Sequence, residues 1–333
     1  MAAGGAGFLR LQAWLPIPSL RAINIYPHPR GDGSVDLVDA GMYTARCVHD
    51  IIRGLRAAGL DPCRIERIVV THFHVDHLTG AAILAEATGA EVLLGRGELE
   101  LVLSTGDPAP FIEAALKLFA ENGMPREEID LIRRSHPAMR AIEAYKALSK
   151  LDLKPLSEGD TVRVGERTYR VAEMPGHTPG HIALIEEGEA YAFTGDLVLQ
   201  GITPHVTLHD PDTDPLGDYM ASLERLAGLG LRLALPGHRE PIEDPAGRAR
   251  EILEHHRQRL DEVHSILEKH GEATGYQVAR EVRWRVRYTT WDEYPPAERF
   301  FAMGEALAHL RRLEVEGRAE RVERGGLTLW RPL

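Results

Sequence analysis

The N-terminal part of the chain, up to about residue 94, alternates between strand-like and helix-like hydrophobic patterns. Short apolar runs at residues 8–15, 21–28 and 34–41 are bounded by Gly, Pro and Asp, and they predict strands that begin an antiparallel sheet. Residues 44–60 then carry apolar side chains at helical spacing, and residues 65–72 form a β-branched run. Residues 80–94 have the pattern of a helix followed by a strand, so this part predicts a βαβ alternation.

The middle of the chain changes to helical patterns alone and then returns to strands. Between about residues 97 and 150, the segments 111–123, 126–136 and 138–150 have apolar faces opposite charged ones. Strand patterns return at 160–176, with a hairpin about Gly165, and at 181–196; a helix at 216–230 and a strand at 231–238 follow. This order predicts mixed sheets and helices with a helical insertion over about residues 97–150.

The C-terminal part has a pattern of its own. Helical spacing runs over residues 245–271, 274–282 and 295–317, and two β-like runs flank Gly325 and Gly326. Three helices and a terminal hairpin are the outline of a winged helix. We therefore expect a larger α/β domain over residues 1–245 and a winged-helix-like domain over residues 246–333.

Composition narrows the class of protein. The chain of 333 residues is 44% apolar and 27% charged, as ordinary globular proteins are. No apolar run approaches the roughly 18 residues of a membrane span, and the N-terminus lacks the pattern of a cleaved signal, so we expect a cytoplasmic protein with no membrane partner. Cys47 and Cys63 are predicted to be reduced thiols. Arg outnumbers Lys by 34 to 5 and amide residues are few, a balance that leans toward a thermophilic source.

Charge is distributed unevenly between the two expected domains. Residues 246–333 hold 16 basic and 15 acidic side chains, whereas the formal net charge of the whole chain is −11. The larger domain is therefore acidic, which suits a metal enzyme. The near-neutral C-terminal part argues against strong affinity for nucleic acid.

The stretch VVTHFHVDHLTGAA, residues 69–82, concentrates groups that bind protons or metals directly after an apolar run. His72 and His74 are two positions apart at a strand exit and can point the same way, whereas Asp76 and His77 come from the turn that follows. An alternative interpretation is a helix N-terminus capped by Asp76. The density of histidines favours a metal site.

Further potential ligands occur downstream, each at a predicted strand end beside a glycine. The segment EMPGHTPGH contains His177 and His181, AFTGDLVL contains Asp196, and LALPGH contains His238. Glycine permits close approach of the backbone, and loops held by a sheet are the usual place for chemistry. These residues are therefore candidates to complete the site.

The pattern H-x-H-x-D-H, followed by a distant His, an Asp and a His, resembles the metallo-β-lactamase superfamily. The match extends over about residues 24–240 and includes LVDAG with Asp39. The resemblance implies an α/β fold, the αββα sandwich, with two metal ions in a cleft at one edge of the paired sheets. It also implies one metal bound by His72, His74 and His177, a second bound by Asp76, His77 and His238, and Asp196 bridging the two. Zinc suits these ligands, with manganese or iron as alternatives.

The residue at position 196 bears on the reaction. The best-known β-lactamases of this superfamily carry Cys there, so the resemblance favours a thioesterase, lactonase, phosphodiesterase or nuclease over a true β-lactamase. We expect a metal-bound hydroxide to attack the substrate and Asp76 to pass a proton to the leaving group. The favoured function is hydrolysis of a small-molecule ester or thioester, with glyoxalase II-like chemistry.

Two other functions stay open. The segments YQVAREV and ALAHLRRLEVEGRAERV resemble hydrolases with a lactamase-associated winged helix, some of which cut single-stranded RNA, so an endoribonuclease or phosphodiesterase is the main alternative. Arg283, Arg285 and Arg287 could form a local basic patch for RNA. A DNA-binding regulator that senses a metal or metabolite is a third hypothesis, which the complete ligand set disfavours. The C-terminal domain could instead close the cleft or join subunits of a homo-oligomer.

Residues around the ligand segments are candidates for the substrate pocket. His181 is either a group that orients a ligand or a packed core residue. His205, His209, Tyr219 and Arg239 could line the pocket, with a surface or packing role as the alternative. The insertion is interpreted as a lid that shapes substrate choice or as a helical decoration or oligomer contact. Its apolar side chains fit an acyl substrate and ordinary packing equally well; they are Phe111, Leu116, Phe119 and Leu131.

Overall fold

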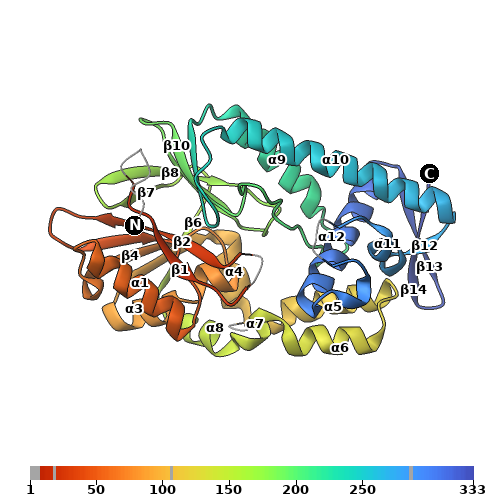
Figure 1. The fold of residues 1–333 in the computed structure, drawn as a ribbon, viewed down its shortest axis with the longest axis horizontal. Coiled ribbons are helices and arrows are strands. Elements are labelled where there is room, and N and C mark those ends of the chain that lie inside the picture. Colours follow the sequence, from red (N-terminus) through yellow and green to blue (C-terminus); the bar gives the residue numbers. More distant parts are fainter. Residues whose placement is uncertain (1–7, 18–19, 106–107, 285–287) are drawn as a thin grey trace.

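Two β-sheets packed face to face form the core of the larger part of the molecule in the computed structural model, which describes residues 8–17, 20–105, 108–284 and 288–333 (Figure 1). The first sheet has the strand order β1-β2-β3-β4-β5-β6 and the second β11-β10-β9-β8-β7. The strands of the first sheet are β1 (Leu11–Trp14), β2 (Ala22–Pro29), β3 (Val35–Val38), β4 (Ile65–Val70), β5 (Glu91–Gly95) and β6 (Leu153–Leu156). Those of the second are β7 (Thr161–Val164), β8 (Arg167–Glu173), β9 (Ile182–Glu186), β10 (Tyr191–Gly195) and β11 (Leu233–Pro236).

Each sheet is mixed, and its parallel pairs are joined by helices. Strands β1 to β3 pair antiparallel, as the sequence predicted, and β3 to β6 pair parallel. In the second sheet only β10 and β11 are parallel. Helices α1 (Ala45–Ala57), α3 (Ala81–Thr88) and α9 (Pro215–Gly228) make the crossovers, and a short 3-10 helix, Pro62–Arg64, precedes β4.

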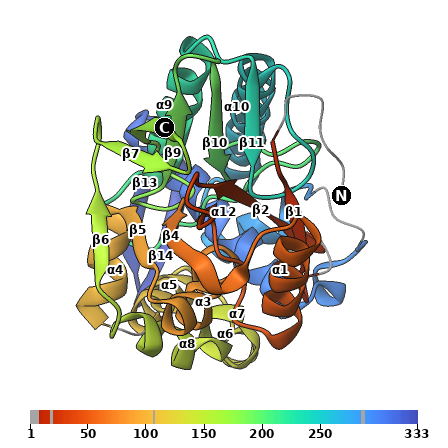
Figure 2. The ribbon, with the colours of Figure 1, turned by 90° about the vertical axis from the view of Figure 1, so that its left-hand side faces the viewer.

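Alternation of side chains along the strands explains the layered fold. In β9, Ile182 and Leu184 face the other sheet, whereas Ala183 and Ile185 belong to the cluster under the helices. In β4, Val69 lies between the sheets. Because β9 and β10 are buried on both faces, they are apolar at most positions, whereas the edge strand β7 alternates exposed and buried residues. Figure 2 shows the resulting order of layers: α9 and α10, the second sheet, the first sheet, and then α3. The predicted αββα architecture is confirmed.

The helical segment between β5 and β6 is longer than the crossover requires. It consists of α4 (Arg96–Thr105), α5 (Ala109–Glu121), α6 (Arg126–Ser135), α7 (Pro137–Arg140) and α8 (Ile142–Leu148). The sequence predicted one helix over residues 138–150, but the chain breaks at Ala141, between α7 and α8. The pattern also missed β6, whose sequence LKPL contains a proline. Proline is tolerated there because β6 is an edge strand.

The C-terminal part begins with the long helix α10 (Pro245–His270). It continues with β12 (Ala273–Thr274), α11 (Gly275–Glu281), a 3-10 helix at Trp291–Glu293, α12 (Pro296–Val315), β13 (Ala319–Arg324) and β14 (Leu327–Pro332). The hairpin of β13 and β14 pairs with β12 in a three-stranded sheet. This order of elements agrees with the pattern in the sequence, and the winged-helix class itself stays a prediction. In the described ranges, no helix is long and apolar enough to cross a membrane.

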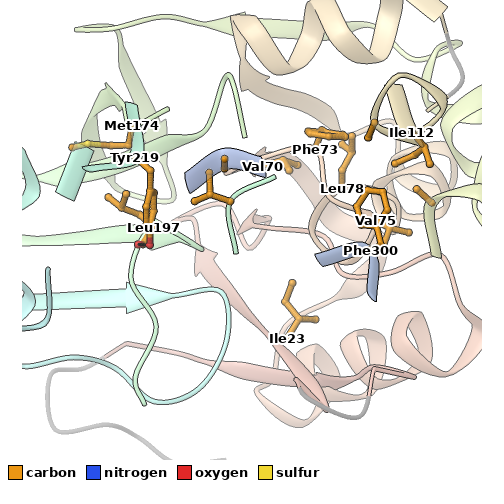
Figure 3. Close-up of a cluster of buried hydrophobic side chains, with 14 of the residues drawn as sticks. Ile23, Val70, Phe73, Val75, Leu78, Ile112, Met174, Leu197, Tyr219 and Phe300 are labelled. Atoms are coloured by element: carbon orange, nitrogen blue, oxygen red, sulfur yellow. Dashed lines mark hydrogen bonds between the residues drawn. The ribbon is translucent and has the colours of Figure 1, made fainter. Parts of the chain in front are cut away.

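The helical insertion and the C-terminal part pack against each other (Figure 1). Glu128 on α6 accepts hydrogen bonds from the Tyr276 hydroxyl and from Trp291 Nε1, and it pairs with Arg299 at 3.1 Å. Trp330 Nε1 donates to Asn122 Oδ1 at the end of α5 at 2.8 Å. One hydrophobic cluster therefore extends from the first sheet through the insertion to α12. In Figure 3, Phe73, Ile112 and Phe300 meet from these three parts of the chain.

Candidate metal centre

The ligands expected from the sequence lie together at one edge of the paired sheets. His72 and His74 follow β4, and Asp76 and His77 lie in the short helix α2 (Val75–Leu78). The others come from the loops after strands of the second sheet: His177 after β8, Asp196 directly after β10, and His238 after β11. Segments separated by more than 100 residues thus converge because their strands end at the same edge.

Three imidazoles form the first group. His74 Nδ1 lies 3.0 Å from His72 Nε2 and 3.0 Å from His177 Nε2. All three rings are in mutual contact, with centroids 4.6 to 4.9 Å apart. Their nitrogen atoms are arranged so that one metal ion could contact all three.

Asp76, His77 and His238 form the second group. His238 Nε2 lies 3.3 Å from His77 Nε2 and 3.2 Å from Asp76 Oδ2. Asp196 lies between the two groups, with Oδ1 3.5 Å from His77 Nε2 and Oδ2 3.8 Å from His177 Nε2. This central position is the one that the resemblance implies for a bridging carboxylate.

The outer ring nitrogen of four of these histidines is fixed by an acceptor. Nδ1 of His177 donates to the carbonyl of His205 at 2.9 Å, and Nδ1 of His238 donates to the carbonyl of Ala22 at 2.8 Å. Nδ1 of His77 donates to Asp39 Oδ2 at 2.8 Å. His72 Nδ1 lies 3.2 Å from the Thr71 hydroxyl, which itself donates to Asp39. In the neutral ring, Nε2 therefore carries a bare lone pair directed into the cluster.

This arrangement fits two divalent cations. Bare lone pairs 3.0 to 3.3 Å apart repel one another unless they share a positive ion. Oδ2 of Asp76 and Oδ1 of Asp196 are buried and accept no hydrogen bond from the described residues, so each has a lone pair left for an ion. Histidine ligands whose second nitrogen is held by a carbonyl or carboxylate are typical of metal sites in proteins.

The electrostatics of the cluster also favour cations. Burial, and then the neighbouring imidazoles, hold the pKa of His72 well below its usual value, so the ring stays neutral. Burial raises the pKa of Asp196, but His238 and His77 outweigh it and lower this pKa well below its usual range. Burial lowers the pKa of His77, yet Asp39 and Asp196 raise it well above normal. A metal ion can replace the proton that these carboxylates attract to His77.

At Gly237 the cluster leaves no room for a side chain. A Cβ added to Gly237 would lie 2.4 Å from His77 Cε1 and 2.9 Å from Asp196 Oδ1. Asp39 has a positive φ of 63°, which directs its carboxylate toward both Thr71 and His77. Strain at such a residue is common where function requires a particular orientation.

Glu98 is a component of the site that the sequence did not reveal. Its buried carboxylate accepts hydrogen bonds from Phe73 N at 2.9 Å, from Gly180 N at 2.7 Å and from the Thr178 hydroxyl. Burial raises the pKa of Glu98 to about 7, against the effect of these bonds. Glu98 thereby ties the loop of His72 and His74 to the loop of His177. The sequence GRGELE carries no signal for this, because the contact depends on the close approach of Gly97 and Gly180.

The proposed pocket residues occupy different positions. His205 lies beside the first group, with its ring stacked on His74 and 4.2 Å from Phe301. His209 stacks on Phe111 at 3.8 Å, so the insertion reaches this side of the site. Arg239 is exposed, with a φ of 67°.

Two other candidates lie behind the cluster rather than at an open surface. His181 is buried, and its Nε2 accepts a hydrogen bond from Asp196 N at 3.2 Å. Tyr219 is buried against Gly176 and donates to the carbonyl of Leu197 at 2.8 Å. Both therefore support the segment that carries Asp196, which fits the orienting role considered for His181.

An apolar cavity of about 110 Å³ adjoins the first group of histidines. Phe73, which lies between His72 and His74 in the chain, forms one wall, and its ring is 5.1 Å from that of His74. The remaining walls come from the insertion; they are Leu101, Val102, Pro108, Pro110, Phe111 and Tyr145. The Tyr145 hydroxyl donates to the carbonyl of Phe73 at 2.9 Å and holds that wall in place.

Comparison with known proteins identifies the family. Residues 30–238 match the metallo-beta-lactamase superfamily, and residues 296–331 match the metallo-beta-lactamase-like C-terminal domain. The chain belongs to the metallo-β-lactamase superfamily and carries in addition the C-terminal domain found among its members. This membership and the metal-binding groups of the site define a metallo-hydrolase.

Several relatives match nearly the whole chain. A probable metallo-hydrolase of Bacillus subtilis, YqjP, is 28% identical over 86% of this chain and 86% of its own. The structure of a metallo-beta-lactamase family protein of Thermus thermophilus, TTHA1429, is 29% identical, with a TM-score of 0.81 over 98% of this chain and 99% of that chain. The structure of a beta-lactamase domain protein of Burkholderia ambifaria is 27% identical, with a TM-score of 0.78 over 97% of this chain and 92% of that chain.

Proposed function

We propose that the protein hydrolyses a small-molecule ester or thioester. The observation that carries this proposal is the apolar cavity lined by Phe73, Phe111 and Tyr145, whose wall residue Phe73 contacts the ring of His74 at 5.1 Å; we propose that this cavity receives the acyl group. Its volume of about 110 Å³ suits a short chain of a few carbon atoms. In this proposal the insertion shapes substrate choice.

The chain's own residues have separable tasks in such a reaction. Two cations, zinc by preference, would be held by the two histidine groups and Asp196, and they would polarise the carbonyl and supply a nucleophile at neutral pH. Asp76 Oδ2 accepts no hydrogen bond within the described ranges and lies 3.2 Å from His238 Nε2, and we propose that it takes up a proton and passes it to the leaving group. Phe73 and Phe111 would exclude water from the acyl side.

Hydrolysis of single-stranded RNA or a phosphodiester is the competing function. Two other arginines of the C-terminal part are paired with acids: Arg312 with Asp214 at 2.9 Å and Arg318 with Asp261 at 2.8 Å. Of the expected basic patch, Arg285 and Arg287 lie outside the described residues. The paired arginines and the acidic larger domain support the small-molecule substrate. The complete set of metal ligands supports an enzyme over a DNA-binding regulator.

The test is a substrate panel offered to the zinc and manganese forms. It contains acyl thioesters and esters of increasing chain length, lactones, a phosphodiester and single-stranded RNA. We expect turnover of short acyl substrates, and we expect Val102→Phe, which fills the cavity, to lower kcat/KM for them about tenfold or more with metal content unchanged. Val315→Phe at an exposed position is the control. Cleavage of RNA without turnover of any ester or thioester would overturn the proposal.

A further inference from the structure

A second cluster of potential metal ligands lies away from the catalytic edge, where α10 meets α12. His255 and His256 are neighbours on α10, and Glu305 projects from α12. One ligand atom from each of these side chains lies within 4.8 Å of the others. His256 is fully buried, and the Glu305 side chain is 13% exposed.

A chain of hydrogen bonds determines which nitrogen of His256 carries the proton. His309 Nδ1 lies 2.7 Å from the carbonyl of Glu305, and a carbonyl can only accept, so this nitrogen is the donor. His309 Nε2 is then bare in the neutral ring and accepts from His256 Nδ1 at 3.2 Å. His309 is fully buried, and burial disfavours the charged form of an imidazole, so the neutral ring is the favoured form.

The consequence is a bare lone pair on His256 Nε2 in the interior of the molecule. This atom is buried and has no hydrogen-bond partner among the described residues. Leaving a buried polar atom unsatisfied is costly, and structures rarely do so without a water or an ion. A histidine whose outer nitrogen donates to a fixed acceptor, with the inner nitrogen bare, is oriented as metal-binding histidines are.

The charges around Glu305 leave room for a cation. Arg259 Nη1 is 3.9 Å from Glu305 Oε1, but Arg259 also pairs with Glu262 at 3.0 Å and lies over the ring of Trp284 at 4.5 Å. Two carboxylates thus share one guanidinium. Of the three side chains, His255 lines an open groove together with Arg259, so the cluster meets this groove at His255.

We propose that His255, His256 and Glu305 form a third metal site, separate from the dinuclear centre, for a borderline divalent ion such as zinc. Two imidazoles and one carboxylate are a known zinc ligand set, and a water completes the coordination. The ion joins α10 to α12 and so fixes the C-terminal helices. The ring of His256 also packs against the ring of Tyr219, with a distance of 5.6 Å between the centroids. The hydroxyl of Tyr219 in turn supports the segment that carries Asp196. This third ion would bind whatever substrate the protein hydrolyses.

Metal analysis of the full chain tests this site. The protein is stripped with a chelator, reloaded with Zn²⁺, desalted, and analysed for zinc per chain. We expect about three ions for the wild type and about two for His256→Leu and for Glu305→Gln. His264→Ala, on the same helix but outside the cluster, should keep all three. Glu305→Gln preserves the size of the side chain, so it separates loss of an ion from loss of the fold.

A background without the dinuclear centre isolates the third ion. In His72→Ala/His238→Ala, each group of the catalytic edge lacks one ligand, and we expect about one zinc per chain and a rise of Tm on addition of Zn²⁺. Adding Glu305→Gln to this variant should abolish both. Two ions in the wild type, or an unchanged zinc content in Glu305→Gln, would overturn the proposal.

Discussion

At the scale of the residue, the cluster of histidines and aspartates depends on side chains outside the candidate ligand set. Glu98 accepts one backbone hydrogen bond from each of two loops that carry histidine ligands, and it does so without a basic partner in the described part of the chain. It therefore sets the distance between His74 and His177. Any displacement of this carboxylate would therefore move the loops that carry these histidines.

We expect Glu98→Gln to weaken both the fold and the metal site. The amide keeps the shape of the side chain but turns an NH₂ group toward a backbone N–H, either at Phe73 or at Gly180, so one buried donor loses its acceptor. This costs about 1–3 kcal/mol of unfolding free energy. Zinc affinity should fall about 10- to 100-fold, as when other supports of metal ligands are removed. Urea unfolding and competition with a zinc indicator measure the two effects.

Glu100→Gln is the matched control, because Glu100 lies on the same helix and is exposed. It should leave both quantities unchanged. Wild-type zinc affinity in Glu98→Gln would contradict a positioning role for Glu98.

The sequence indicated the residues that lie together in the cluster better than the residues that support them. His72, His74, His177 and His238 were visible because histidine at a strand exit, beside glycine or in an H-x-H pattern, carries information locally. Glu98 was not visible, because its role arises only when Gly180 packs on Gly97. For the same reason His181 remained ambiguous until its bond to Asp196 N could be located.

At the scale of the element, the break between α6 and α7 contains a titratable cap. His136 ends α6, and its Nδ1 accepts from Ala138 N at 3.2 Å at the start of α7. The ring is buried against Phe300, 4.6 Å away, and burial lowers the pKa of His136 to about 4. The folded state thus keeps His136 neutral where the unfolded chain protonates it.

This depressed pKa makes stability depend on pH. Between about pH 6.5 and 4 the unfolded state binds the proton and the folded state does not, so stability is full above about pH 6.5 and falls as the pH drops toward 4. The contribution is at most about 3 kcal/mol. His136→Asn keeps a capping acceptor without the titration, so the wild type should lose stability relative to this variant over that range. Urea unfolding at several pH values measures the difference in unfolding free energy between the wild type and this variant. A difference that stays constant from about pH 6.5 to about pH 4 would contradict the titration of His136.

Most elements could be predicted from hydrophobic periodicity, and the exceptions have local causes. The strands of the two sheets and the long helices α10 and α12 follow strong patterns. Strand β6 is an exception, because Lys154 and Pro155 interrupt its apolar run. Strand β12 is another, because it is only two residues long. The break at Ala141 was hidden because both α7 and α8 continue the same apolar face.

At the scale of the whole molecule, the two predicted domains share their core. Residues of the insertion and of α12 belong to one hydrophobic cluster, and Glu128 and Asn122 bind the C-terminal part by hydrogen bonds. The sequence indicated two domains because the hydrophobic pattern changes near residue 245. It could not indicate that the helical insertion packs on the second of them, since this contact joins segments far apart in the chain.

We therefore expect the full chain to unfold in a single transition. Tryptophan fluorescence, to which the buried Trp330 contributes, and far-ultraviolet circular dichroism should give the same midpoint. A fragment of residues 1–245 should be less stable and aggregate, because it exposes the apolar faces of α5 and α6. Two separate transitions in the full chain, or a fragment as stable as the parent, would contradict a shared core.

The fixed outer nitrogens of the clustered histidines determine what the proposed metal centre would need in order to fill. Nδ1 of His77, His177 and His238 is already committed to an acceptor before any ion arrives. None of these rings has to flip or exchange its tautomer during uptake. Once the proton held by His77 has left, we expect the slow step of loading to be the shedding of water by the incoming ion, so metals that dehydrate quickly should enter soonest, whatever their final affinity.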